Sequence, residues 1–207
     1  MRTGLTMKLR FYLAMLAAAV ALAPAAARAD PAASPQDFVT RLMARAPGKG
    51  KTFACFTRIY DAAHLAAHPQ QNVRSMMVLI TVDSTDVYNY SLAVGSLFRS
   101  RKGLLESSGD CAFAHDESDA SSPRTARCSI ACDGGSFEIA LKDNGSVLLT
   151  VPEGARLWRP GSEDPGDNVH GAFGPDDKLF RLDRAPLSQC VALGADAAEK
   201  AQLRRGE

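Results

Sequence analysis

The clearest pattern along the chain is an alternation of apolar and polar side chains across residues 87–99. A period of two residues is typical of a half-buried β-strand. The apolar positions would share one face of such a strand: Tyr88, Tyr90, Leu92, Val94 and Phe98. We therefore predict a strand here whose aromatic side faces the interior of the domain.

Seven other segments are short, rich in β-branched or aromatic residues, and separated by turn-forming residues. They are 53–60, 75–82, 104–113, 127–132, 137–141, 146–151 and 178–184. Asn144-Gly145, between two of them, is a strong hairpin signal because both residues tolerate positive φ. About eight strands with almost no helix between them predict an all-β fold, an antiparallel meander. We favour a barrel; a two-sheet sandwich is the alternative that fits the same segments.

Short helices are expected at both ends of this β-rich region. Ser34, Pro35 and Asp37 form a helix-start pattern, and residues 195–205 have helical character. The predicted organisation is an N-terminal helix and linker over 30–52, a β-domain over 53–190, and a C-terminal helix or tail over 191–207.

The first 29 residues have the three parts of a cleavable signal peptide. A basic start is followed by an apolar run over 11–22, which is short for a membrane span, and then by Ala27-Arg28-Ala29. We predict cleavage between Ala29 and Asp30 and a final location in the periplasm or outside the cell. The remaining chain has no expected membrane association.

Cleavage would also change the charge of the chain. The full sequence has a formal charge of +1, and loss of four basic residues leaves 20 basic against 23 acidic residues, or −3. Nucleic acid attracts proteins with a basic surface, so we expect no nucleic-acid partner.

All five cysteines lie in the part of the chain that would be exported. Disulfides are the default state of cysteine in an oxidising compartment. The preferred pairs are Cys111–Cys128 and Cys55–Cys190, and Cys111–Cys132 is the alternative for the first. An odd count leaves one thiol unpaired, so a thiol-dependent activity is a minor hypothesis.

One segment carries residue types that bind transition metals. If residues 60–68 form a helix, Asp61, His64 and His68 share a face and could hold a metal ion, or a histidine could ligate haem. Pro69 disfavours helix at His68. A loop or single turn between strands, whose histidines cap backbone groups, is therefore the competing interpretation.

The aromatic face of segment 87–99 offers a different site. Tyr88, Tyr90 and Phe98 would line a cavity for a small apolar ligand if an eight-stranded barrel left its interior partly empty. The simpler interpretation is that these side chains fill a packed core.

Three stretches, CFTRIYDAAHLAAHP, RCSIACDGGSFEI and KLFRLDR, resemble a family of exported alphaproteobacterial proteins without an assigned activity. The resemblance extends over most of residues 53–190 and implies an exported location and a β-rich fold. It implies no functional residue.

The sequence contains no catalytic motif that we recognise. We therefore predict a periplasmic β-domain that is structural or binds a small ligand or a partner protein, and is not an enzyme. The alternative is a metal- or haem-binding protein, or a metal-dependent enzyme, that uses Asp61, His64 and His68.

Overall fold

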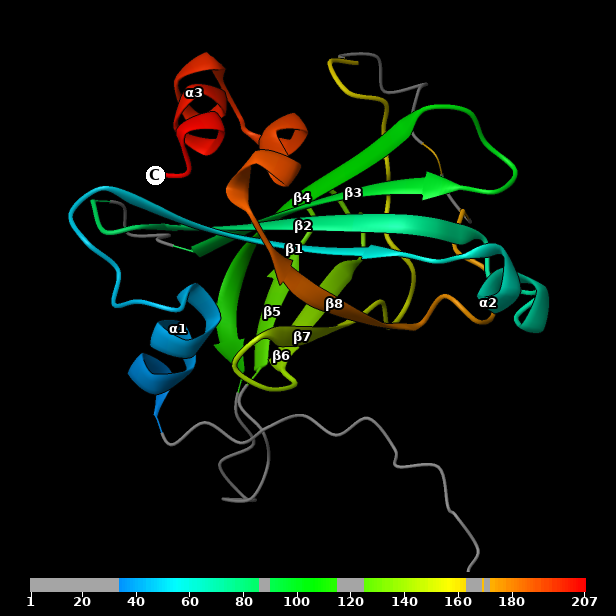
Figure 1. Cartoon of the computed structure of the whole chain (residues 1–207), viewed down its shortest axis with the longest axis horizontal. Helices are drawn as coiled ribbons and strands as arrows, with labels where there is room; N and C mark the ends of the chain where they lie inside the picture. The colour runs from blue at the N-terminus through cyan, green and yellow to red at the C-terminus, as the bar shows by residue number, and fades with distance from the viewer. Residues whose placement is uncertain (1–33, 86–89, 115–124, 163–168, 170–171) are drawn as a thin grey trace, which may run out of the picture.

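The computed structural model describes residues 34–85, 90–114, 125–162, 169 and 172–207, and it confirms the β-barrel (Figure 1). Eight antiparallel strands follow one another around a closed barrel, each beside its neighbours in the sequence. The strands are β1 (Lys51–Ile59), β2 (Val73–Asp83), β3 (Tyr90–Phe98), β4 (Leu104–Ala114), β5 (Thr125–Ser129), β6 (Ser136–Leu141), β7 (Ser146–Thr150) and β8 (Leu179–Ala185). Closure excludes the two-sheet sandwich.

The barrel closes where β8 returns to β1. This seam is short: three positions of each strand are in register, from Cys55 opposite Ala185 to Thr57 opposite Asp183. By contrast, β1 and β2 pair along the whole of β1, from Lys51 to Ile59. Backbone pairing at the seam is therefore limited, and other contacts must contribute to closure.

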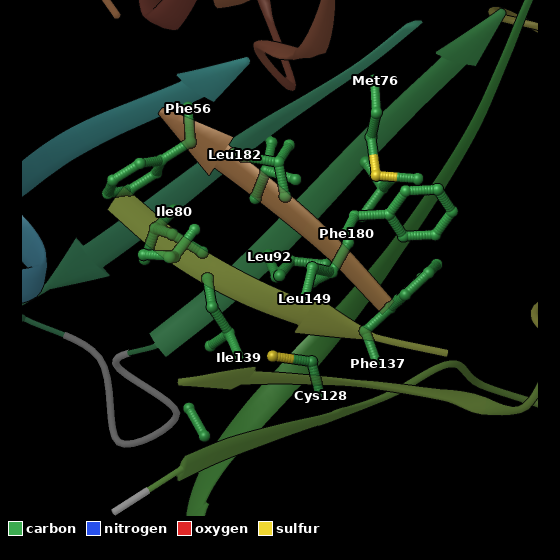
Figure 2. Close-up of a cluster of buried hydrophobic side chains, with 14 of the residues drawn as sticks. Phe56, Met76, Ile80, Leu92, Cys128, Phe137, Ile139, Leu149, Phe180 and Leu182 are labelled. Atoms are coloured by element: carbon green, nitrogen blue, oxygen red, sulfur yellow. The ribbon is translucent and has the colours of Figure 1, made fainter. Parts of the chain in front are cut away.

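Side chains fill the interior of the barrel (Figure 2). Inward positions alternate along each strand, as the period of two requires. The largest of them come from strands on every side and are almost completely buried: Phe56, Met76, Leu92, Phe98, Leu105, Phe137, Ile139, Leu149 and Phe180. Barrels of eight strands have about the width that side chains alone can fill.

Helix α1 (Pro35–Met43) adds to this core at one end of the barrel. The Ser34 side chain accepts a hydrogen bond from the Asp37 backbone N–H, so the predicted helix start is confirmed. The helix ends at Ala44, whose φ of 58° is left-handed. Arg184 of β8 donates to the carbonyl oxygens of Arg41 and Leu42, and this fixes the end of the helix against the barrel.

A second apolar cluster lies outside the barrel, beneath the C-terminal segment. The 3₁₀-helix η2 (Leu187–Leu193) and helix α3 (Ala197–Arg205) cover the outer face of the first strands (Figure 1). Six buried residues form the cluster: Phe53, Cys55, Leu79, Cys190, Leu193 and Leu203. The sequence indicated α3 but not η2.

Both preferred disulfide pairs are present. Cys55 of β1 is bonded to Cys190 of η2, and Cys111 of β4 to Cys128 of β5. Cys132 is exposed and free, so the alternative Cys111–Cys132 pairing is wrong. The backbone of Cys132 and Asp133 is left-handed, with φ of 55° and 58°. The strand predicted for 127–132 therefore ends early, at Ser129.

We predict that loss of the Cys55–Cys190 bond destabilises the protein more than loss of the Cys111–Cys128 bond. The first bond closes a span of 135 residues and the second a span of 17. Loop entropy then gives contributions of about 5 and about 3 kcal/mol. Thermal unfolding of Cys55→Ala/Cys190→Ala and Cys111→Ala/Cys128→Ala, each compared with the parent protein, measures the difference.

Each kcal/mol corresponds to about 2–4 °C in Tm for a domain of this size, so the first double variant should melt several degrees below the second. Cys132→Ser is the control and should melt with the parent. Equal decreases in Tm in the two double variants would contradict the prediction.

Candidate functional site

The three residues considered for a metal site lie at one end of the barrel, around helix α2 (Ala62–Ala67). The helix does form, with Asp61 as its N-cap: the Asp61 carboxylate accepts a hydrogen bond from the His64 backbone N–H. The His64 ring bonds to the Gln71 side chain through Nε2, at 3.0 Å, and stacks on the rings of Tyr60 and His68. The Asp61 carboxylate and His64 Nε2 are thus used within the fold.

Among the described residues, no three His, Cys, Asp or Glu side chains lie together in a way that could hold a metal ion. His115 and His170, the other two histidines of the chain, lie outside these residues. The cap on the backbone comes from Asp61 and not from a histidine, and the His64 ring bonds to a side chain, so the contacts also differ from the histidine capping of the competing interpretation.

The residues considered for an interior ligand cavity belong to the packed core. Phe98 is 1 % exposed and contacts Phe173 edge to face, with ring centroids 5.5 Å apart. Tyr90 packs against the same core. Tyr88 lies outside the described residues. Phe98 and Tyr90 therefore have the core role that was the simpler interpretation.

A groove of about 820 Å³ lies on the outside of the barrel. Its floor is the outer face of β2, β3 and β4, including Leu79, Ala93 and Ser108. One wall is the segment from η2 to α3, and the opposite wall is Trp158 with Pro160 and Gly161. Pockets for small molecules have volumes of about 300–1,000 Å³, so this groove has a suitable size.

The wall formed by η2 and α3 is attached to the barrel by a buried carboxylate. Glu199 is 6 % exposed and receives two hydrogen bonds, from Lys51 Nζ at 2.5 Å and from the Ala195 backbone N–H at 2.8 Å. The bond to Glu199 raises the pKa of Lys51. This ion pair joins the first strand to the last helix and fixes one side of the groove.

Glu106 is a second acidic residue in the groove, on the outer face of β4. Burial raises the pKa of its carboxyl, and the nearby Lys200 charge and a hydrogen bond with the Trp158 side chain oppose that shift. Its backbone exchanges two hydrogen bonds with Trp158, at 2.8 and 2.9 Å. Glu106 and Trp158 are therefore fixed side by side at the groove wall.

Ser107 follows Glu106 on β4, and its side chain faces the other way, into the barrel, on the same side as Leu105 and as Val94 opposite it. The residue is 1 % exposed, and its hydroxyl has no hydrogen-bond partner among the described residues. A buried hydroxyl without a partner is unfavourable in free energy, because its bonds to water are not replaced.

A smaller hollow of about 530 Å³ lies at an end of the barrel, beside Asp177. Asp177 is buried, which raises the pKa of its carboxyl. It accepts hydrogen bonds from the backbone N–H groups of Asn72, Val73 and Gly174. These bonds join the start of β2 to the segment before β8, so Asp177 has a structural role.

No sequence motif links the residues that line the groove. Glu106 and Trp158 are 52 positions apart, and Lys200 is in the last helix. Trp158 lies outside every predicted strand, and Glu106 lies within the one predicted over 104–113. The structure reveals the site because strand pairing places these elements side by side.

Comparison of the chain with protein-family models, with curated proteins and with solved structures finds no significant match. In the described part of the chain, no helix is long and apolar enough to cross a membrane.

Proposed function

We propose that this protein is an exported, non-enzymatic binding protein that takes a small ligand in the groove between β2–β4 and the η2–α3 segment. The observation that carries the proposal is the groove itself, which has a ligand-sized volume and mixed polar and apolar walls. The barrel interior is filled by side chains, so the ligand binds outside it.

Export is supported by two features of the chain. The two disulfide bonds are of the kind that forms and persists in oxidising compartments. The first 29 residues have the pattern of a signal peptide and lie outside the described residues. The exported form begins at Asp30 and works in the periplasm or outside the cell.

Expression of the full chain in a Gram-negative host tests export. Intact mass and N-terminal sequencing of the protein from the periplasmic fraction should give a chain that begins at Asp30. Replacing both small residues of the cleavage site, with Ala27→Leu and Ala29→Leu, should leave the precursor uncleaved. Recovery of an unprocessed parent chain from the cytoplasm would contradict export.

A fragment screen on residues 30–207 tests the groove. We expect protein-observed NMR with a library of neutral, cationic and anionic fragments to give binders whose shift changes cluster at groove residues such as Leu79, Ala93 and Trp158. Ala93→Trp places a large side chain on the groove floor and should abolish this binding by filling the space.

Leu179→Trp is the matched control, since it adds the same side chain at an exposed apolar position of β8 outside the groove. It should leave fragment binding unchanged. Binders that cluster elsewhere, or that bind Ala93→Trp as well as the parent protein, would contradict the groove as the binding site.

A further inference from the structure

We infer that the groove binds a primary carboxamide, and that this group lies against the backbone N–H and C=O of Ser108 in β4. The inference rests on the proposed function, because it names the ligand chemistry of the same groove. It is carried by a gap in the backbone pairing along one edge of β4, and by the position of that gap in the groove.

The edge of β4 that faces away from β3 is paired on both sides of this gap. Glu106 exchanges two backbone hydrogen bonds with Trp158, at 2.8 and 2.9 Å. Farther along the strand, the pairing with β5 begins at Asp110, which lies opposite Ser129. Alternate residues of a strand direct their backbone N–H and C=O groups to the same edge. Those of Ser108, midway between Glu106 and Asp110, therefore point to this edge as well.

Ser108 has no residue opposite it at this edge. Its neighbours Ser107 and Gly109 direct their backbone groups the other way, toward β3, where they lie opposite Val94 and Leu92. Within the described part of the chain, no hydrogen bond is formed to the Ser108 N–H or C=O. Ser108 is exposed and lines the groove, so a ligand can reach both groups.

The gap is one residue long, and this determines which chemical group fits it. Glu106 and Asp110 are already paired, so a polypeptide strand cannot run along β4 past Ser108. An extended residue presents its N–H and C=O side by side, and a primary carboxamide presents one N–H and its C=O in the same way. The two can therefore form a pair of hydrogen bonds. In a trans peptide bond the N–H and C=O point in opposite directions, so an ordinary peptide group would make only one of these bonds.

Apolar residues flank the gap on both sides. Ile130 and Ala131 follow the end of β5 on one side, Trp158 and Pro160 lie on the other, and all four line the groove. A carboxamide paired with Ser108 directs its substituent away from β4, into the space between these residues. The ligand therefore has an apolar or aromatic body attached to the carboxamide.

The test uses three probes with the same phenylethyl body: 3-phenylpropanamide, 4-phenylbutan-2-one and 3-phenylpropanoate. The ketone has a methyl group in place of the amide NH₂, and the carboxylate has acceptors only. Each probe is titrated into residues 30–207 at pH 7.5 and followed by NMR. The amide should bind about tenfold more tightly than the other two, because neither of them can donate a hydrogen bond to the Ser108 C=O.

Ser108→Pro removes the backbone N–H at the gap and should weaken amide binding about tenfold. The Ser108 N–H faces away from β3, so proline removes no hydrogen bond of the β3–β4 ladder. Ser108→Ala is the matched control, because it removes the side-chain hydroxyl and keeps both backbone groups. It should bind all three probes as the parent protein does.

A second measurement needs no variant. In the free parent protein, the Ser108 N–H should exchange with solvent faster than the N–H groups of Ser107 and Gly109, which face β3. Saturation with 3-phenylpropanamide should slow the exchange of the Ser108 N–H and move its proton resonance downfield, because the N–H then donates to the amide oxygen.

Ketone or carboxylate binding as tight as amide binding would overturn the inference, as would equal weakening in Ser108→Ala and Ser108→Pro. Slow exchange of the Ser108 N–H in the free protein would also overturn it, since that N–H would already have a partner. Equal binding of all three probes in the groove would leave the proposed function intact and refute only the carboxamide site. Absence of binding by all three also contradicts the inference, and the fragment screen alone then decides the proposed function.

Discussion

The structure depends on how the barrel closes between its first and last strands. The β1–β8 seam is three positions long. Cys55, at one end of it, is bonded to Cys190 of η2, which follows β8. Around this bond lies an apolar cluster that includes Phe53, Leu79 and Leu193. The backbone pairing of the seam is short, so the Cys55–Cys190 bond and this buried cluster provide much of the stability there.

The same bond also positions the groove. Because Cys190 is in η2, the disulfide holds the chain that follows it against the outer face of β1 and β2, and the Lys51–Glu199 ion pair attaches α3 to the start of β1. The wall opposite is fixed independently by the backbone bridge between Glu106 and Trp158. The interior of the barrel is a packed core, and the groove lies on its outside, between two separately anchored walls.

Much of this fold could be predicted from the sequence, and the candidate site could not. The alternation of apolar and polar side chains marks the strands, and hairpin turns such as Asn144-Gly145 place consecutive strands side by side. When such a meander closes into a barrel, its first and last strands meet, which brings Cys55 near Cys190. Strand ends were less predictable: the backbone of Cys132 turns left-handed where the pattern favoured a strand. The groove depends on contacts between Glu106, Trp158 and Lys200, which are distant in sequence and share no motif. The prominent Asp61 and His64 instead satisfy local hydrogen bonds around α2.

The central claim is that the Cys55–Cys190 bond holds the groove wall as well as the seam. Hydrogen–deuterium exchange measured by mass spectrometry on the parent protein and on Cys55→Ala/Cys190→Ala, under conditions where both are folded, tests it most directly. The account predicts faster exchange in η2 and α3 and along β1 and β8, with β5, β6 and β7 unchanged. Exchange that is unchanged in η2 and α3, or that increases equally in every strand, would contradict it.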